Sequence, residues 1–147
     1  MSAQTYKALI LDYVERVWNC GDGAALDELT TPTFLYRMGS LPGHDHAEMR
    51  QLITMLHTAF PDWRVQVVEI VAEENTVVIR WEGNVTHLGT FHGIPATGKR
   101  IAVNGINMYH IIDGKVASEW EQTHVLGWLQ QMGLLLNHGT FLLWVGF

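Results

Sequence analysis

Two glutamates near the end of the sequence have the residue type and spacing needed to transfer protons. Glu119 and Glu121 lie in Val116–Thr123, whose β-branched and aromatic residues predict a strand. Strand alternation puts both glutamates on one face and Trp120 on the other. On a solvated sheet this pair would be only a polar surface. If the face is buried, desolvation raises the pKa of a carboxyl, which can then act as a general acid near neutral pH.

A second group of candidates lies on the segment before, Arg100–Ile112, which also predicts a strand. One of its faces carries Val103, Gly105, Asn107 and Tyr109. Asn107 has one acceptor and two donors, so it could hold a carbonyl oxygen or position a water. The alternative is an interior amide whose partners all belong to the protein. Gly105 leaves the face without a side chain and could enlarge a pocket there.

Eight histidines raise the question of a metal site. The one tight cluster is His44, Asp45 and His46, which are adjacent or two apart, whereas ligands on one helix face are three or four apart. His57 falls beside the apolar stripe of its predicted helix, which is more typical of a core or pocket-lining residue. The sequence has no Gly-rich phosphate loop and no Gly-x-Ser-x-Gly motif. We therefore expect no metal and no cofactor.

Hydrophobic periodicity predicts that helices precede the strands that carry these candidates. A first amphipathic helix has Tyr13 and Trp18 on its apolar face. Asp45 with Glu48 predicts a capping pair at the start of another helix, which Pro61 terminates. The other predicted elements are a helix at Ala24–Leu29, strands at Thr33–Met38, Trp63–Ala72, Thr76–His87, Arg100–Ile112 and Val116–Thr123, and a helix at Val125–Met132. This order is typical of the α+β class.

Four stretches of the second half resemble the SnoaL-like polyketide cyclases, within the nuclear-transport-factor-2-like superfamily. They are Phe60-Pro61-Asp62-Trp63, the run Thr86–Lys99, the turn Ile111–Val116, and Glu119-Trp120 through Leu126–Gly133. The resemblance extends from about the first helix to Leu134. It implies an α+β cone, in which N-terminal helices pack on a strongly curved, mostly antiparallel sheet with an internal pocket. We expect one domain over residues 1–134, with 135–147 as an apolar tail that extends it.

The resemblance also implies which residues form the site. Cyclases of this type carry a carboxylic acid six residues after the lysine of the Asp-Gly-Lys turn, and counting from Lys115 gives Glu121. Asn107 stands at the position of an assisting histidine, and Gly105 at a nearby glutamine position. Glu121 and Asn107 are therefore the expected catalytic residues. The expected substrate-binding residues are Tyr36, Trp63, Val103, Gly105, Tyr109 and Glu119.

The expected function is that of a cofactor-independent acid/base enzyme. Its substrate would be a small apolar, polyketide-like carbonyl compound, and the reaction an aldol cyclisation or an isomerisation. Arg80 and Glu82 share a face of Thr76–His87 and are most simply an exposed ion pair. With Glu121 they also resemble the acid, base and arginine of limonene-epoxide-hydrolase-like relatives, so an epoxide hydrolase is an alternative. A non-catalytic binder of a hydrophobic small molecule is another.

Composition narrows the set of partners. The 147 residues have a net charge of −6 and no run of lysine or arginine, which makes nucleic acid and anionic membranes poor partners. The N-terminus lacks a signal-peptide pattern, no apolar run is long enough to span a membrane, and Cys20 is the one cysteine, so we expect a cytoplasmic protein. The tail carries Phe141, Trp144 and Phe147, which need to be covered. We expect a homodimer that binds a small hydrophobic molecule.

Overall fold

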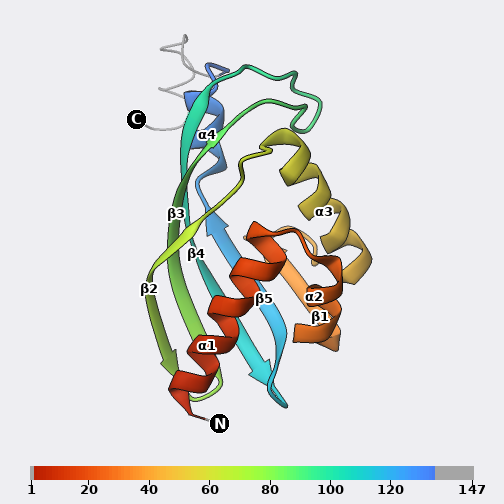
Figure 1. The fold of residues 1–147 in the computed structure, drawn as a ribbon, viewed down its shortest axis with the longest axis vertical. Coiled ribbons are helices and arrows are strands. Elements are labelled where there is room, and N and C mark those ends of the chain that lie inside the picture. The colour runs from red at the N-terminus through yellow and green to blue at the C-terminus, as the bar shows by residue number, and fades with distance from the viewer. Residues whose placement is uncertain (1, 135–147) are drawn as a thin grey trace.

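Most helical elements lie in the first part of the chain and most strands in the second in the computed structural model, which describes residues 2–134 (Figure 1). The helical elements are α1 (Ala3–Tyr13), a π-helical turn (Val14–Asn19), α2 (Gly23–Leu29), α3 (His46–Ala59) and α4 (Val125–Gln131). The strands are β1 (Thr30–Met38), β2 (Gln66–Glu73), β3 (Thr76–Thr86), β4 (Arg100–Ile112) and β5 (Lys115–Thr123). The predicted tail at 135–147 lies outside the described residues.

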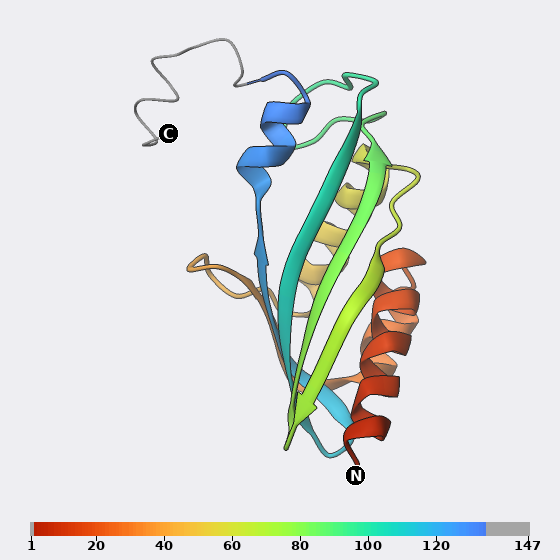
Figure 2. The same cartoon turned by 90° about the vertical axis from the view of Figure 1, so that its left-hand side faces the viewer.

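The five strands form one curved sheet in the order β1-β5-β4-β3-β2. Neighbouring strands are antiparallel, except that β1 runs parallel to β5. The sheet does not close into a barrel, so β1 and β2 are its two edges. In Figure 1 the sheet extends from β2 at the left to β1 at the right, and α1, α2 and α3 lie on its concave side. Figure 2 shows α4 near the end of the sheet that carries the loop between β3 and β4. The predicted α+β class is confirmed.

The core lies between the concave face of the sheet and the helices that cover it. Apolar residues of the first helix reach the core at Ile10, Tyr13 and Val17, all fully buried. On the sheet side, alternate residues of β4 are buried, as a strand with one solvated face requires. The helices within residues 2–134 include none that is both long and apolar enough to cross a lipid bilayer.

The predicted capping pair at the start of α3 is confirmed. The Asp45 side chain accepts a hydrogen bond from the Glu48 backbone N–H at 3.0 Å, and the Glu48 side chain accepts one from the Asp45 N–H at 3.2 Å. This reciprocal pair satisfies two donors that the first turn of a helix leaves free. The helix ends at Ala59, just before Pro61 as the sequence predicted.

Three local features differ from the prediction. Strand β1 begins at Thr30 rather than Thr33, because Thr30 already pairs with Val116 of β5. Strand β2 begins at Gln66 rather than Trp63. The Asn19 side chain accepts a hydrogen bond from the Val65 N–H and donates one to the Val65 C=O, so Val65 does not pair with the neighbouring strand. The helix after Tyr13 widens into a π-helical turn, in which the Cys20 N–H bonds to the Glu15 carbonyl five residues earlier.

Candidate active site

The two glutamates of β5 point into the concave side of the sheet. Glu119 is fully buried and Glu121 is 8% exposed, whereas Trp120 between them is 41% exposed on the outer face. The predicted alternation is therefore confirmed, and the inward face is the one that carries the carboxyls. An inward carboxyl loses most of its hydration, so its surroundings decide whether it holds a proton.

Asn107 joins the two glutamates. It lies opposite Glu121 in the register of β4 and β5. Its Nδ2 donates to Glu119 Oε2 at 2.8 Å and to Glu121 Oε1 at 3.3 Å, while its Oδ1 accepts from the Trp81 indole at 2.8 Å. Of the two interpretations of Asn107, the structure shows the interior amide, with both its N–H groups and its oxygen engaged by protein side chains.

Glu119 is held by three donors from three elements. Tyr13 of α1 donates its hydroxyl at 2.7 Å, Trp18 of the π-helical turn donates its indole N–H at 2.9 Å, and Asn107 donates from β4. Both carboxylate oxygens are therefore occupied. Glu119 was expected to contact substrate, but the residues that line the cavities beside Glu121 do not include it.

Glu121 lies where two small cavities meet. The inner cavity has a volume of about 20 Å³ and is lined by residues of β3 and β4, including Trp81, Asn107 and Tyr109. The outer cavity has a volume of about 80 Å³ and is lined mainly by apolar side chains of α3, β1 and α4. Trp18, Trp63 and Glu121 line both cavities. Glu121 is the one acidic residue that the described part of the chain contributes to either lining.

This environment raises the pKa of Glu121 to about 7. Burial is the largest cause, because it disfavours the charged form of the carboxyl. The nearby Glu119 carboxyl adds to the rise, because its negative charge repels a second one. Hydrogen bonding from Asn107 and the Tyr36 hydroxyl opposes the rise. Burial also raises the pKa of Glu119, and its donors, Tyr13 first among them, oppose that rise. A carboxyl with a pKa near 7 can give or take a proton at neutral pH.

The other predicted substrate-binding residues divide into two groups. Tyr36 and Trp63 line the outer cavity, and Tyr109 lines the inner one. Val103 is buried and lines neither cavity; it lines the separate groove beside α1 that is described below. Gly105 also lines neither cavity.

The idea that Gly105 enlarges the pocket is wrong. A Cβ placed there would lie 2.5 Å from Cζ2 of Trp81, the residue opposite it in the register of β3 and β4. The missing side chain therefore makes room for the Trp81 indole, which reaches Asn107.

Three residues that position the site were missed by sequence reasoning. Tyr13 and Trp18 were assigned to the apolar face of a helix, and Trp81 was not singled out. Each buries a large ring and donates one hydrogen bond to the network around the glutamates. The one available signal was a tryptophan and a glycine on neighbouring predicted strands, Trp81 and Gly105, whose register the sequence does not give.

The hydrolase arrangement is wrong, because Arg80 and Glu82 point away from Glu121. They lie on the outer face of β3, where Arg80 forms ion pairs with Glu69 at 2.7 Å and with Glu82 at 3.6 Å. All three side chains are largely exposed. The sheet itself separates them from the cavities, since alternate residues of a strand face opposite sides.

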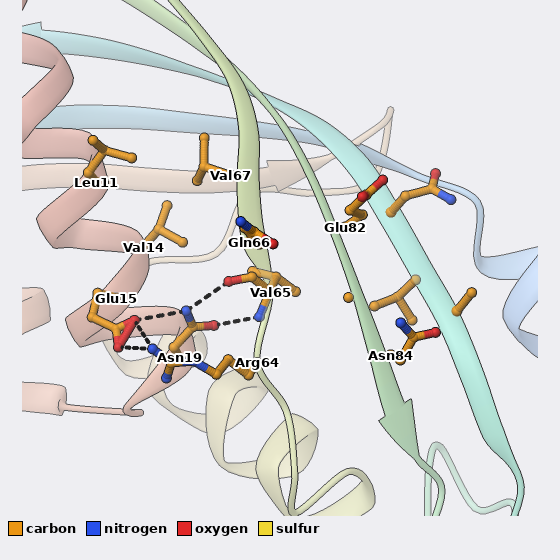
Figure 3. A pocket seen from close by; sticks show the side chains of 14 residues that line it. Leu11, Val14, Glu15, Asn19, Arg64, Val65, Gln66, Val67, Glu82 and Asn84 are labelled. Carbon is orange, nitrogen blue, oxygen red and sulfur yellow. Dashed lines mark hydrogen bonds and ion pairs between the residues drawn. The ribbon is translucent and has the colours of Figure 1, made fainter.

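A wide groove of about 850 Å³ lies beside α1 and the start of β2 (Figure 3). Figure 3 shows two contacts that stabilise one wall of this groove. They are the ion pair of Glu15 with Arg64, at 2.6 Å, and the two hydrogen bonds between Asn19 and Val65. Val14 and Val65 line both this groove and the inner cavity, so those two side chains separate it from the buried site. Glu121 does not line the groove.

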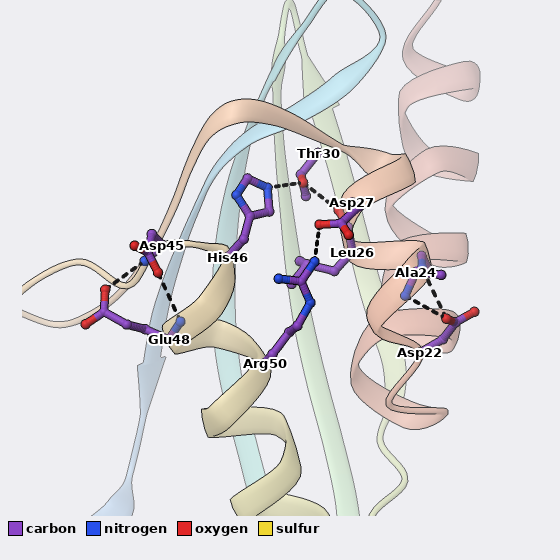
Figure 4. A network of polar contacts seen from close by, with 10 residues as sticks. Asp22, Ala24, Leu26, Asp27, Thr30, Asp45, His46, Glu48 and Arg50 are labelled. Atoms are coloured by element: carbon purple, nitrogen blue, oxygen red, sulfur yellow. Dashed lines mark hydrogen bonds and ion pairs between the residues drawn. The ribbon is translucent and has the colours of Figure 1, made fainter.

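The side chains of Asp45 and His46, two members of the histidine cluster, have structural partners (Figure 4). His46 bonds to the Thr30 hydroxyl at 2.8 Å, and Asp45 caps α3. Within residues 2–134, no three His, Cys, Asp or Glu side chains come together as a metal site would require. His57 bonds to the backbone carbonyl of Trp18 at 2.8 Å, which fits its expected place beside the core.

An open, curved sheet with helices on its concave face and a buried carboxyl in a small apolar cavity defines an α+β cone protein with an internal site. Residues 8–132 match the SnoaL-like polyketide cyclase family, and the chain belongs to this family. The resemblance noted in the sequence is therefore confirmed.

Two curated relatives are the aklanonic acid methyl ester cyclases DnrD of Streptomyces peucetius and DauD of Streptomyces sp. strain C5, each 32% identical over 83 residues. The matches cover 55% of this chain and 57% and 51% of the relatives, so the chain spans little more than half their length. Among solved structures, AclR from Streptomyces galilaeus, described as a proposed hydroxylase, is 30% identical with a TM-score of 0.80 over 90% of this chain and 98% of its own. A Jannaschia sp. CCS1 protein described as a SnoaL-like polyketide cyclase has a TM-score of 0.82 over 88% of this chain and 92% of its own; at 20% identity it shows the fold alone.

Proposed function

We propose that this protein is a cofactor-independent acid/base enzyme that cyclises or isomerises a small apolar, polyketide-like carbonyl compound. The observation that carries the proposal is the position of Glu121, a buried carboxyl with a pKa of about 7 at the junction of two apolar cavities. Its membership of a family of polyketide cyclases supports the same class of reaction.

In an aldol cyclisation, Glu121 would act as the acid. A carbon between two carbonyl groups loses a proton readily, and the resulting carbanion attacks a ketone carbon of the same molecule. The new carbon–carbon bond moves the carbonyl π electrons onto oxygen, and Glu121 donates its proton to that oxygen. The proton lost by the acidic carbon passes to solvent, and the Glu121 carboxylate takes a proton back from solvent when the product leaves, which restores the acid. The apolar walls hold the chain folded and exclude water.

The size of the cavities limits the substrate. The outer cavity of about 80 Å³ is well below the roughly 300–1,000 Å³ typical of ligand sites. Aromatic rings, among them Trp63, Phe91 and Trp128, occupy much of the surrounding space. Substrate binding therefore requires the flexible side chains Met38 and Met55 of the wall to move aside, which favours a smaller substrate than a polycyclic one.

The test is turnover of candidate carbonyl compounds by the purified protein and by Glu121→Gln. The first candidates are short 1,3-dicarbonyl chains, and the aklanonic acid methyl ester named for the curated relatives is the larger compound for comparison. Loss of a general acid costs on the order of 10²–10⁴ in rate, whereas binding of the compound should change little. In the unaltered protein, kcat/KM should fall as pH rises above about 7, because the acid form disappears.

The matched control is Glu82→Gln, which removes a carboxylate from the outer face of β3. This variant should keep full activity. Undiminished turnover by Glu121→Gln would show that Glu121 is not the acid. Tight binding of a compound that the protein never converts would favour the non-catalytic binder, and an oxygenated product would favour the description given to AclR.

A further inference from the structure

Glu119 has no place in the mechanism above, although it is fully buried next to the proposed acid. A buried carboxyl is costly unless it is neutral or well supplied with hydrogen bonds. Tyr13, Trp18 and Asn107 each bring an N–H or O–H group to it, at 2.7–2.9 Å. An indole N–H and an amide N–H can only donate, so this environment matches a charged carboxylate, which only accepts.

The π-helical turn is what brings two of these donors to the same carboxyl. Tyr13 and Trp18 are five residues apart, and in a regular α-helix such residues point about 140° away from each other. The widened turn brings them onto the same side, so that Tyr13 reaches Oε1 and Trp18 reaches Oε2. The hydroxyl of Tyr109 lies nearby without a hydrogen-bond partner of good geometry and adds a fourth potential donor.

Glu121 has a different environment. Within residues 2–134 the Glu121 carboxyl has one side-chain hydrogen bond, the long one from Asn107 at 3.3 Å, and the Tyr36 hydroxyl faces it from β1. The shared Asn107 nitrogen brings the two glutamate oxygens to within about 6 Å of each other, close enough for one charge to disfavour the other. Two neighbouring carboxyls that differ so strongly in donors separate into one ionised and one protonated group.

We propose that Glu119 is a positioning residue, a carboxylate that ionises before Glu121 and so keeps the Glu121 carboxyl neutral and able to donate its proton. Asn107 transmits the arrangement, because one amide group bonds to both carboxyls and fixes Glu121 toward the cavities. The groups that face the pair are the hydroxyls of Tyr13, Tyr36 and Tyr109, and burial raises the pKa of each of them, so they stay neutral donors.

The inference rests on the proposed role of Glu121, but it is tested without substrate, so that the two can fail separately. The carboxyl carbons of the full chain are titrated by ¹³C NMR, and the signals are assigned by their loss in Glu119→Gln and Glu121→Gln. In the unaltered protein, Glu119 should titrate at lower pH than Glu121. In Glu119→Gln, we expect the pKa of Glu121 to fall by at least about one, a tenfold loss of proton affinity.

Two further variants keep the test decisive. Glu82→Gln removes one negative charge from the opposite face of the sheet and should leave the pKa of Glu121 unchanged. Tyr13→Phe keeps the buried ring and removes one donor, so the pKa of Glu119 should rise even if Glu119→Gln does not fold. The inference is overturned if Glu119 titrates above Glu121, or if a folded Glu119→Gln leaves the Glu121 titration where it was.

Discussion

At the scale of single residues, the site depends on a few polar groups whose partners differ. Glu119 has three donors and no contact with the cavities, whereas Glu121 has one longer hydrogen bond and lines both cavities. The two residues are identical in chemistry and two positions apart on one strand. Their environments, rather than their residue type, separate a fixed charge from a group that can exchange its proton.

The raised pKa of Glu121 predicts a pH dependence of stability. Between about pH 4.5 and pH 7 the unfolded chain has lost the proton of Glu121 while the folded protein keeps it. The folded state therefore binds more protons, and the free energy of unfolding falls as pH rises through this range, by about 3 kcal/mol for this group. Glu121→Gln lacks this contribution. Urea unfolding of both proteins at pH 4.5 and pH 7.5 measures it, and an equal difference between them at the two pH values would contradict the prediction.

At the scale of elements, the pairing of β3 with β4 places Trp81 over Gly105, where no other side chain fits. We expect Gly105→Ala to destabilise the protein by about 1–3 kcal/mol, because the added methyl overlaps the indole that holds Asn107. Denaturant unfolding checks the loss of stability. Gly43→Ala is the control, since a Cβ there meets Arg37 only at an ordinary contact distance of 3.5 Å. Equal stability of both variants would show that the Trp81 indole is free to move.

The strands β3 and β4 also show how much of the fold and of the site could be predicted from the sequence. Period-two patterns predicted the bounds of β4 and placed both glutamates on one face of β5, and the capping pair of Asp45 and Glu48 marked the start of α3. Those signals are local. The contact of Trp81 with Asn107 depends on the register between two strands, and the π-helical turn follows the same apolar pattern as an α-helix, so neither has a local signature.

At the scale of the whole molecule, the outer face of the sheet has exposed apolar side chains. Ile106 and Met108 of β4 and Trp120 of β5 lie there, with 51%, 40% and 41% of their surface exposed. Figure 1 shows the helices α1 to α3 on the other side of the sheet. An exposed apolar patch of this kind is typical of an interface between proteins, so we propose that two copies pair through these faces.

The homodimer predicts that Met108→Glu lowers the molar mass in solution toward that of one chain, because the charge would be buried at the centre of the interface. Light scattering at micromolar concentration measures this. Leu41→Glu is the control, since Leu41 is also apolar and is 59% exposed but lies in the loop after β1. A monomeric intact protein would refute the dimer.

The π-helical turn has a consequence for how this sequence can evolve. It holds an additional residue relative to a regular helix, and that residue is what turns Trp18 back toward the carboxyl that Tyr13 also contacts. Loss of the extra residue alone would leave a buried charge short of a donor, and loss of Glu119 alone would leave three buried donors without that acceptor. The insertion and the glutamate are therefore expected to be inherited as a pair, so that lineages gain or lose both together.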